Sequence, residues 1–271
     1  MKSTVYKNNI PWGFTMNKKS IKIKIFSIIL LSVTSNHLLA EEKTHDKSAW
    51  NRLYIGSQIN SLHYKSSFST SSQPGSYFIN EDYAQLMTAG SGSLSGKDNS
   101  AGINIGWNYA WNNFIVGIEA DYLEANKKFK INSGDVVYIT QPAHTFKTVS
   151  QININHTFSL RPKVGYLWGD SLVYITGGLS LVKLDYRFNF SETFQNQQAT
   201  ASKSNTQKGW TIGAGMEHTL NNNWSVKFEF LYSEFDQLNA SSQLTDYPDQ
   251  IIDNKVKIKM SNVRIGVNYW F

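Results

Sequence analysis

The feature that most constrains this chain is a set of short stretches in which every second residue is apolar. In residues 101–109 the odd positions hold Ala, Ile, Ile, Trp and Tyr, and the even positions hold Gly and Asn. Residues 114–122, 212–217, 224–232 and 263–271 repeat the pattern. A period of two is that of a β-strand with one apolar face. The pattern therefore predicts an all-β fold.

The connections between these stretches predict how the strands are arranged. Three connections are tight turns rich in Asn, Gly and Asp, and the other four are predicted to be long, polar loops. Their strict alternation is typical of an eight-stranded antiparallel transmembrane β-barrel, with short periplasmic turns, long extracellular loops and both termini periplasmic. The predicted strands lie near residues 52–65, 100–110, 113–126, 151–168, 171–189, 208–220, 223–236 and 255–271, the turns at 111–112, 169–170 and 221–222, and the loops at 66–99, 127–150, 190–207 and 237–254.

A soluble β-sandwich or a lipocalin is the main alternative, since alternation alone does not exclude either. Two features favour the membrane barrel. An apolar interior would have to fit large aromatic side chains into a lumen that is barely wide enough for side chains. In addition, aromatic residues collect at the strand ends, as at the two interfaces of a bilayer. One predicted belt comprises Trp107, Tyr109, Trp111, Phe114, Tyr166, Trp168, Trp224, Tyr269 and Phe271, and the other Tyr122, Tyr186, Phe188, Tyr232 and Phe235.

Two positions do not fit a regular strand. Pro162 lacks a backbone N–H and lies inside the fourth strand, which predicts a bulge or a local break there. In the last strand, Val256, Ile258 and Met260 are out of phase with Val263 and the residues that follow it. This change of phase predicts a bulge or a twist near Ser261.

The N-terminal residues predict export. Residues 1–40 contain six lysines and no Asp, Glu or Arg, followed from Ile25 by a short apolar run and closed by Ala40. This order is typical of a cleaved signal peptide, and the apolar run is shorter than the ~20 residues that span a bilayer. We expect a signal peptide over 1–40, with Met16 as the true start, and a mature β-barrel domain over 41–271.

Charge and cysteine content exclude several function classes. The formal net charge is +6, from 26 basic and 20 acidic residues. Without the six lysines of residues 1–40 the balance is 20 to 20, so no nucleic-acid partner is expected. The absence of cysteine excludes disulfides and thiolate metal sites.

Several strands resemble a known family. The segments 209–218 (GWTIGAGMEH) and 223–232 (NWSVKFEFLY), the ending 263–271 (VRIGVNYWF), and the hairpin segments 106–109 and 116–122 carry the likeness. They resemble the alpha-proteobacterial porin-like surface-antigen family, which includes hemin-binding proteins and is related in architecture to outer-membrane protein A-type barrels. The resemblance implies that the barrel-assembly machinery reads the C-terminal strand, which ends on Phe271. It covers residues 100–271 and leaves the loops unassigned.

No constellation in the sequence favours catalysis. Of the six histidines, His37 lies in the predicted signal and His45 in the N-terminal tail. His156 and His218 are in phase with apolar residues, which favours a lipid-facing or interfacial position. No pair has metal-ligand spacing, and the glycines form no phosphate-binding loop before a helix. We therefore expect no enzyme, no catalytic residue and no metal site.

Three non-enzymatic functions remain open. The first is a structural surface barrel whose loops contact host molecules or neighbouring lipopolysaccharide. The second is a ligand receptor or adhesin, with hemin as the ligand that the resemblance implies. Hemin requires an axial His or Tyr, and His63, His144 and Tyr138 are the candidates nearest the exposed end. The third is a small porin.

The predicted inward face bears on the porin hypothesis. On this face four acidic residues meet four basic ones, and buried charges are costly unless each is paired. The balance favours a salt-bridged plug that leaves the lumen closed. The acidic residues are Glu119, Asp121, Glu217 and Glu229, and the basic residues are Arg161, Lys163, Lys227 and Arg264.

Overall fold

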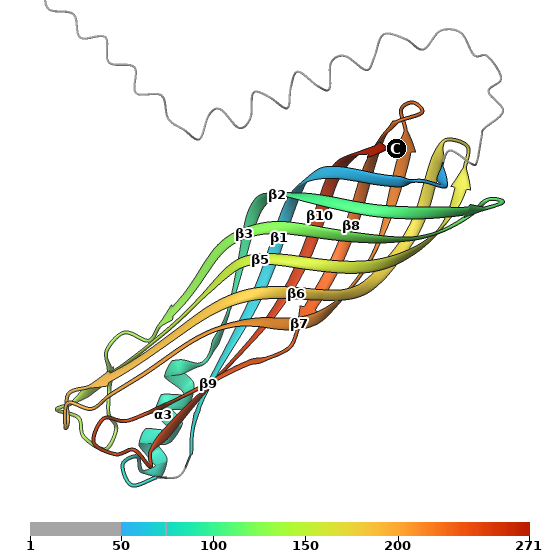
Figure 1. Cartoon of the computed structure of the whole chain (residues 1–271). Coiled ribbons are helices and arrows are strands. Elements are labelled where there is room, and N and C mark those ends of the chain that lie inside the picture. The colour runs from blue at the N-terminus through green and yellow to red at the C-terminus, as the bar shows by residue number, and fades with distance from the viewer. Residues whose placement is uncertain (1–49, 74) are drawn as a thin grey trace, which may run out of the picture. The chain divides into compact units, whose positions relative to one another are not determined.

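Eight long antiparallel strands form a closed ring in the computed structural model, which describes residues 50–73 and 75–271 (Figure 1). Each strand pairs with its neighbours in sequence order, and β1 closes the ring by pairing with β10. The predicted eight-stranded antiparallel barrel is therefore confirmed. The ring strands are β1 (Leu53–Ser72), β2 (Gly92–Trp111), β3 (Phe114–Asn132), β5 (Thr145–Trp168), β6 (Ser171–Glu192), β7 (Gln198–Thr219), β8 (Trp224–Phe235) and β10 (Ile251–Trp270).

The strands are tilted within the ring, as their register shows. A path from Ile55 across paired residues, once round the ring, returns to β1 at Lys65, ten residues further along. Closing a sheet with such a stagger requires tilted strands and leaves an eight-stranded interior just wide enough for side chains. Which side chains fill that interior therefore decides whether the barrel can conduct.

The three tight turns are confirmed, but the four long polar loops are not. Nearly half of the residues predicted as loops continue the strands: β1 runs to Ser72, β3 to Asn132, and β6 and β7 are joined by residues 193–197 alone. The reason lies in the environment of these segments. Beyond the bilayer a strand exposes its outer face to water, so Ser, Thr, Asn and Lys replace the apolar residues that made the strands recognisable.

Three smaller elements lie at the end of the barrel away from the tight turns: α3 (Asn80–Gly90), β4 (Val136–Val137) and β9 (Leu238–Gln243). The helix follows β1 and buries Leu86 in the barrel core. It is also bound to the hairpin around β4, where Gln85 Nε2 donates to the carbonyl of Val137 at 2.9 Å. No helix in residues 50–73 and 75–271 is long and apolar enough to cross a bilayer.

Along the half of the barrel nearest the tight turns, apolar side chains point outward. This outer surface bears exposed Ile, Val, Leu, Met and Phe on every ring strand, among them Ile59, Ile103, Ile118, Leu160, Ile175, Ile212, Phe228 and Ile265. Trp107, Trp111, Phe114, Trp168 and Phe271 are exposed at the turn end, which confirms the aromatic belt predicted there. We call this surface the apolar band.

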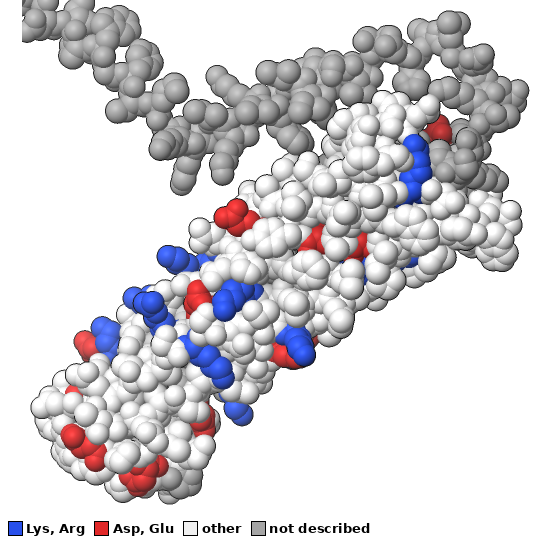
Figure 2. Space-filling model, in the orientation of Figure 1, with Lys and Arg blue, Asp and Glu red and all other residues white. Residues whose placement is uncertain are grey.

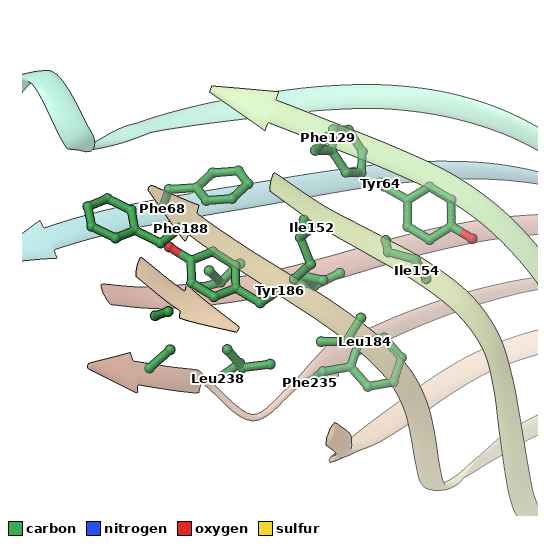
Figure 3. Packing of buried hydrophobic residues seen from close by; sticks show 14 of the residues in the cluster. Tyr64, Phe68, Phe129, Ile152, Ile154, Leu184, Tyr186, Phe188, Phe235 and Leu238 are labelled. Atoms are coloured by element: carbon green, nitrogen blue, oxygen red, sulfur yellow. The ribbon is translucent and has the colours of Figure 1, made fainter. Parts of the chain in front are cut away.

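The other half of the barrel has the opposite arrangement. Apolar side chains from the ring strands fill its interior, where they form one buried cluster (Figure 3). Tyr186, Phe188 and Phe235 belong to this cluster and are at most 2% exposed. Their predicted place in a second outer aromatic belt is therefore wrong, whereas Tyr122 does face outward. We call the cluster the extracellular core.

This reversal also explains the phase change in the last strand. Val256, Ile258, Met260 and Arg264 all face inward, and β10 pairs with β1 in one unbroken register across Ser261. The predicted bulge near Ser261 is absent from that register, so the bulge is wrong, and the alternative of a local twist stays a prediction. The side chains stay on one face, and only the interior changes, from apolar near Val256 to charged at Arg264.

Pro162 produces a local break without a bulge. The ladder between β5 and β6 passes from Leu160↔Leu179 to Lys163↔Thr176 without a change of register. The register shift on β5 lies instead between Ile154 and His156. Because Pro162 lacks an N–H, it cannot donate a hydrogen bond to β6. Its carbonyl oxygen instead accepts one from the Thr176 hydroxyl at 2.8 Å.

The predicted signal peptide, its start at Met16 and its boundary at Ala40 lie outside the described residues. The mature domain predicted over 41–271 is described from Trp50 onward, apart from residue 74.

The outward position of Ile265 allows a test of the apolar band. Ile265 is 44% exposed and lies between Ile59 of β1 and Phe228 of β8. We expect Ile265→Lys to lower the free energy of unfolding in lipid by about 2–4 kcal/mol, because a charge would enter the bilayer.

Gly266→Ser is the matched inward control. A Cβ atom there would lie 3.1 Å from the Ser57 carbonyl oxygen and 3.2 Å from Lys227 Cε. The substitution therefore requires these neighbouring atoms to move by only a few tenths of an ångström. Unfolding titrations in lipid bilayers should show the smaller loss for Gly266→Ser. Equal losses for the two variants would contradict the assignment of faces.

Candidate functional site

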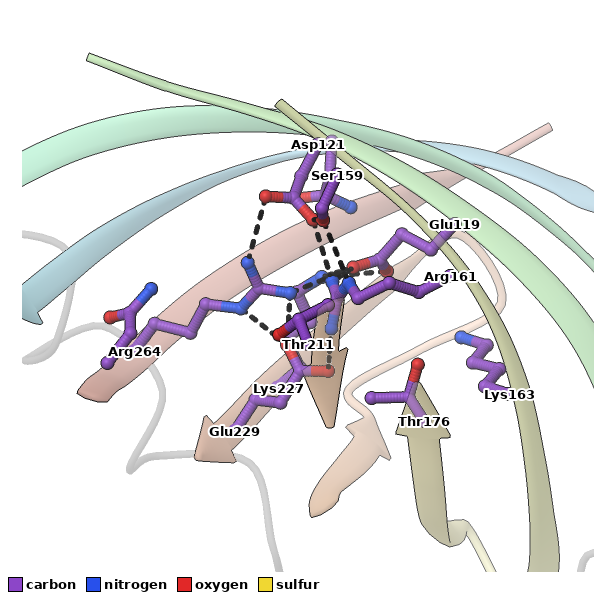
Figure 4. Close-up of polar contacts among 12 residues, drawn as sticks. Glu119, Asp121, Ser159, Arg161, Lys163, Thr176, Thr211, Lys227, Glu229 and Arg264 are labelled. Carbon is purple, nitrogen blue, oxygen red and sulfur yellow. Dashed lines mark hydrogen bonds and ion pairs between the residues drawn. The ribbon is translucent and has the colours of Figure 1, made fainter. Parts of the chain in front are cut away.

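The turn-end half of the barrel encloses a network of buried charges (Figure 4). Glu119 of β3 is its centre and is 3% exposed. Its carboxylate lies 2.8 Å from Arg161 Nη2, 2.8 Å from Lys227 Nζ and 3.1 Å from Arg264 Nη2. Tyr54 Oη donates a further hydrogen bond to Glu119 Oε2 at 2.7 Å. One carboxylate thus holds three cations that come from three different strands.

A second layer joins the two arginines to the remaining carboxylates. Arg161 lies 2.8 Å from Asp121 Oδ2 and 3.0 Å from Glu229 Oε1. Arg264 lies 3.4 Å from Asp121 Oδ1 and is also paired with Glu229. Ser159 donates to Asp121 at 2.5 Å and accepts from Arg161 Nε at 3.0 Å. Planar guanidinium groups suit such shared pairing because each offers five donors.

A third group continues the network toward the tight turns. Lys163 Nζ donates to Tyr54 Oη at 2.9 Å, and Glu217 Oε2 lies 3.8 Å away from that nitrogen. Glu217 Oε1 accepts from Ser225 at 2.5 Å and from Asn268 Nδ2 at 2.6 Å. Polar contacts therefore link this interior from Asp121 to the neighbourhood of Trp270, whose Nε1 donates to Ser225 Oγ at 2.8 Å.

The eight inward charges predicted from the sequence are all confirmed: each is at most 6% exposed. A strict period of two was enough to identify them. The neutral partners Tyr54 and Tyr174 were missed, although they lie on the same inward face of their strands; Lys163 Nζ lies 5.1 Å from the centre of the Tyr174 ring. The signal that could have found Tyr54 is its position between the apolar outward residues Leu53 and Ile55.

The stability of such a network depends on the balance between desolvation and ion pairing. Removing several ions from water costs several kcal/mol each, and this cost is recovered only if every charge is paired and hydrogen-bonded. Here each of the four acidic and four basic side chains lies within 4 Å of an opposite charge, and Glu217 Oε2 is the carboxylate oxygen of this set that accepts no hydrogen bond from the described residues. The four charges of each sign leave the interior electrically balanced.

The three residues considered as axial hemin ligands do not converge. His63 is exposed on the outer face of β1. Tyr138 is buried and packs on Phe146, with ring centroids 4.9 Å apart, while the ring of His144 packs on Phe194 at 5.2 Å. His144 and Tyr138 are joined through their backbones, where Tyr138 N donates to the His144 carbonyl at 3.0 Å. Burial raises the pKa of Tyr138, so its phenol stays protonated at neutral pH.

His156 and His218 lie as predicted, and His37 and His45 lie outside the described residues. His156 faces outward beside Tyr122, with ring centroids 5.6 Å apart. His218 is exposed near the tight turns, and its Nδ1 lies 2.9 Å from Ser171 Oγ. Within the described part of the chain, no three His, Asp or Glu side chains are arranged to hold a metal ion.

A small cavity lies at the extracellular end. Its volume is about 190 Å³, and Tyr77, Asp82, Tyr138 and Tyr247 are among the residues that line it. Tyr77 Oη donates to Glu192 at 2.9 Å; burial and this carboxylate both raise the tyrosine pKa. Pockets for drug-sized ligands usually span ~300–1,000 Å³, so this cavity is smaller than a typical ligand pocket.

An apolar outer band, an aromatic belt and a paired polar interior are the features of an outer-membrane barrel. The family model for the outer membrane protein beta-barrel domain matches residues 27–271. This chain belongs to that family. It is an integral β-barrel of the bacterial outer membrane, and the tight turns mark its periplasmic end. The family resemblance inferred from the strand motifs is confirmed.

Among its relatives is the 31 kDa outer-membrane immunogenic protein of Brucella melitensis. The two are 30% identical over 228 residues, which cover 83% of this chain and 85% of the relative. The 25 kDa outer-membrane immunogenic protein of Brucella abortus is 24% identical, over 72% of this chain and 76% of the relative.

Solved structures with similar folds include two small outer-membrane proteins. One is the attachment invasion locus protein Ail of Yersinia pestis, with 13% identity, a TM-score of 0.35, and coverage of 80% of this chain and 98% of Ail. The other is OprG of Pseudomonas aeruginosa, with 10% identity, a TM-score of 0.43, and coverage of 81% of this chain and 96% of OprG.

Proposed function

We propose that this protein is a closed, non-enzymatic surface barrel that acts structurally and through contacts made by its extracellular end. One observation carries the proposal: the interior is occupied along both halves of the barrel. Paired charges fill the half within the bilayer, and the extracellular core fills the half beyond it.

Each half opposes conduction for a different reason. An ion that entered the charged half would have to displace side chains that already neutralise one another, such as Arg161 and Glu119 at 2.8 Å. In the other half, Phe188 and Ile152 are fully buried in an apolar cluster, and an ion there would be desolvated without a partner. Water-filled channels belong to barrels with more strands, whereas eight strands leave room for side chains or for one small ligand, and here side chains occupy that space.

The strands that extend beyond the bilayer support the second part of the proposal. They carry α3, β4 and β9 at their end, and this end bears both the small cavity and the loops. Functional contacts in proteins concentrate on loops held by a rigid scaffold. The extracellular core supplies that rigidity, because it packs the extended strands from within.

Planar-bilayer recording tests whether the barrel is closed. Pure refolded protein, with insertion checked by heat-modifiable gel mobility and by protease protection of the strands, should give no steady conductance at neutral pH. Glu124→Gln, an exposed outward change on β3, serves as a matched preparation control and should also be silent. Steady, large, ohmic channels from both proteins would contradict the proposal.

A further inference from the structure

Basic side chains on the outer surface are concentrated at one height along the barrel. Figure 2 shows Lys and Arg side chains gathered at mid-length, with some Asp and Glu side chains among them and others near the end that carries α3. The apolar band lies on the other side of the basic zone. Basic side chains therefore begin where the surface that lies in the bilayer ends.

Five outward-facing lysines form one patch on the neighbouring strands β2, β1 and β10, which we call the lysine patch: Lys65, Lys97, Lys255, Lys257 and Lys259. Lys65 lies directly opposite Lys259 in the β1–β10 register, and Lys257 and Lys255 follow at alternate positions. Lys97 lies opposite His63, one diagonal step from Lys65. All five point outward.

The positive charge of the patch exceeds the negative charge paired with it. One carboxylate, that of Glu234, is bound to the patch, at 2.5 Å from Lys257 and 3.2 Å from Lys259. Asp253, further along β10, is already bound by Gln73 at 2.7 Å and Ser241 at 2.6 Å. Like charges directly opposite each other on a sheet are destabilising. A bound external anion would therefore reduce the repulsion between Lys65 and Lys259.

The height of the patch indicates where that anion lies. On β10 the band ends at Val263, and Lys259 lies four residues earlier in the sequence, about 13 Å along the strand away from the band. The usual strand tilt reduces this to about 10 Å along the bilayer normal. The headgroup layer on each side of a bilayer is ~5–8 Å deep, and a lysine side chain can bend back toward it. Lys259, with Lys65 opposite it, is thus the part of the patch nearest the headgroups of the outer leaflet, and Lys257 and Lys255 lie farther from the bilayer along β10.

We propose that the lysine patch binds the phosphate groups of a phosphorylated glycolipid in the outer leaflet. Its neighbours Ser67, Ser69 and Ser261 offer hydroxyl donors beside the ammonium groups, which suits phosphate oxygens and the sugars that carry them. This inference is independent of whether the barrel conducts, so the test below and the bilayer recording can fail separately.

The experiment compares two triple variants with equal loss of charge. Lys65→Gln/Lys257→Gln/Lys259→Gln removes the centre of the patch, and Lys128→Gln/Lys130→Gln/Lys203→Gln removes exposed lysines from β3 and β7. Each full-length mature protein is refolded, incubated with diphosphorylated lipid A or with enzymatically dephosphorylated lipid A, and exchanged into detergent. Mass spectrometry then counts the lipid molecules retained per barrel, and circular dichroism checks folding.

We expect the wild type to retain diphosphorylated lipid A and to lose the dephosphorylated form. The patch variant should retain at least tenfold less lipid, while the β3/β7 variant should behave as wild type. Equal retention of both lipids by the wild type would overturn the proposal. So would equal losses in the two variants, which indicate diffuse attraction, or complete displacement of the lipid by millimolar inorganic phosphate, which indicates a site for the free ion.

Discussion

Replacing Glu119 with Gln should lower the free energy of unfolding by about 3–5 kcal/mol, because three buried cations lose their common partner. Arg161, Lys227 and Arg264 all lie within 3.1 Å of the Glu119 carboxylate, and each is at most 1% exposed. Gln keeps the shape of the side chain but removes its charge, so the loss reports on electrostatics. Urea titration of the barrel in lipid vesicles measures it.

Two further variants test whether the loss of stability comes from the unpaired cations. Glu124→Gln, on the outer face of the same strand, should change stability by less than about 0.5 kcal/mol, as surface substitutions usually do. Adding Lys227→Met to Glu119→Gln should recover part of the loss, since the double variant removes one unpaired cation. A Glu119→Gln barrel as stable as the wild type would show that the network does not hold the interior together.

The second large effect is expected in the extracellular core. Phe188 of β6 is fully buried there, and truncation of a buried Phe to Ala costs about 3–5 kcal/mol. We expect Phe188→Ala to loosen the strands beyond the bilayer more than those within it, because the charged half makes its own contacts. Hydrogen exchange should therefore accelerate at the extracellular ends of β5, β6 and β7.

Asn189→Ala is the matched control, because Asn189 is the next residue on β6 and is exposed on the outer face. It should leave exchange in both halves unchanged. Uniform acceleration over the whole barrel in Phe188→Ala would contradict the division of the interior into two separately stabilised halves, and would indicate one cooperative unit instead.

The sequence by itself determined the part of the barrel that lies in the membrane. There lipid accepts only apolar side chains on the outer face, so the period of two is strict and the strand from Val263 to Phe271 can be recognised residue by residue. The same rule placed Glu119 and Arg264 inside. Their pairing was predicted only as a balance of charge, because adjacency across the lumen depends on register and stagger.

Only the tertiary structure decided how far the strands continue. Beyond the bilayer, water accepts Ser, Lys and Asn on the outer face, and an apolar residue such as Phe68 recurs too rarely to mark a strand. The inward face at Val256 and Tyr186 becomes apolar because these residues pack against one another across the barrel. That contact joins strands distant in sequence, and no local pattern records it.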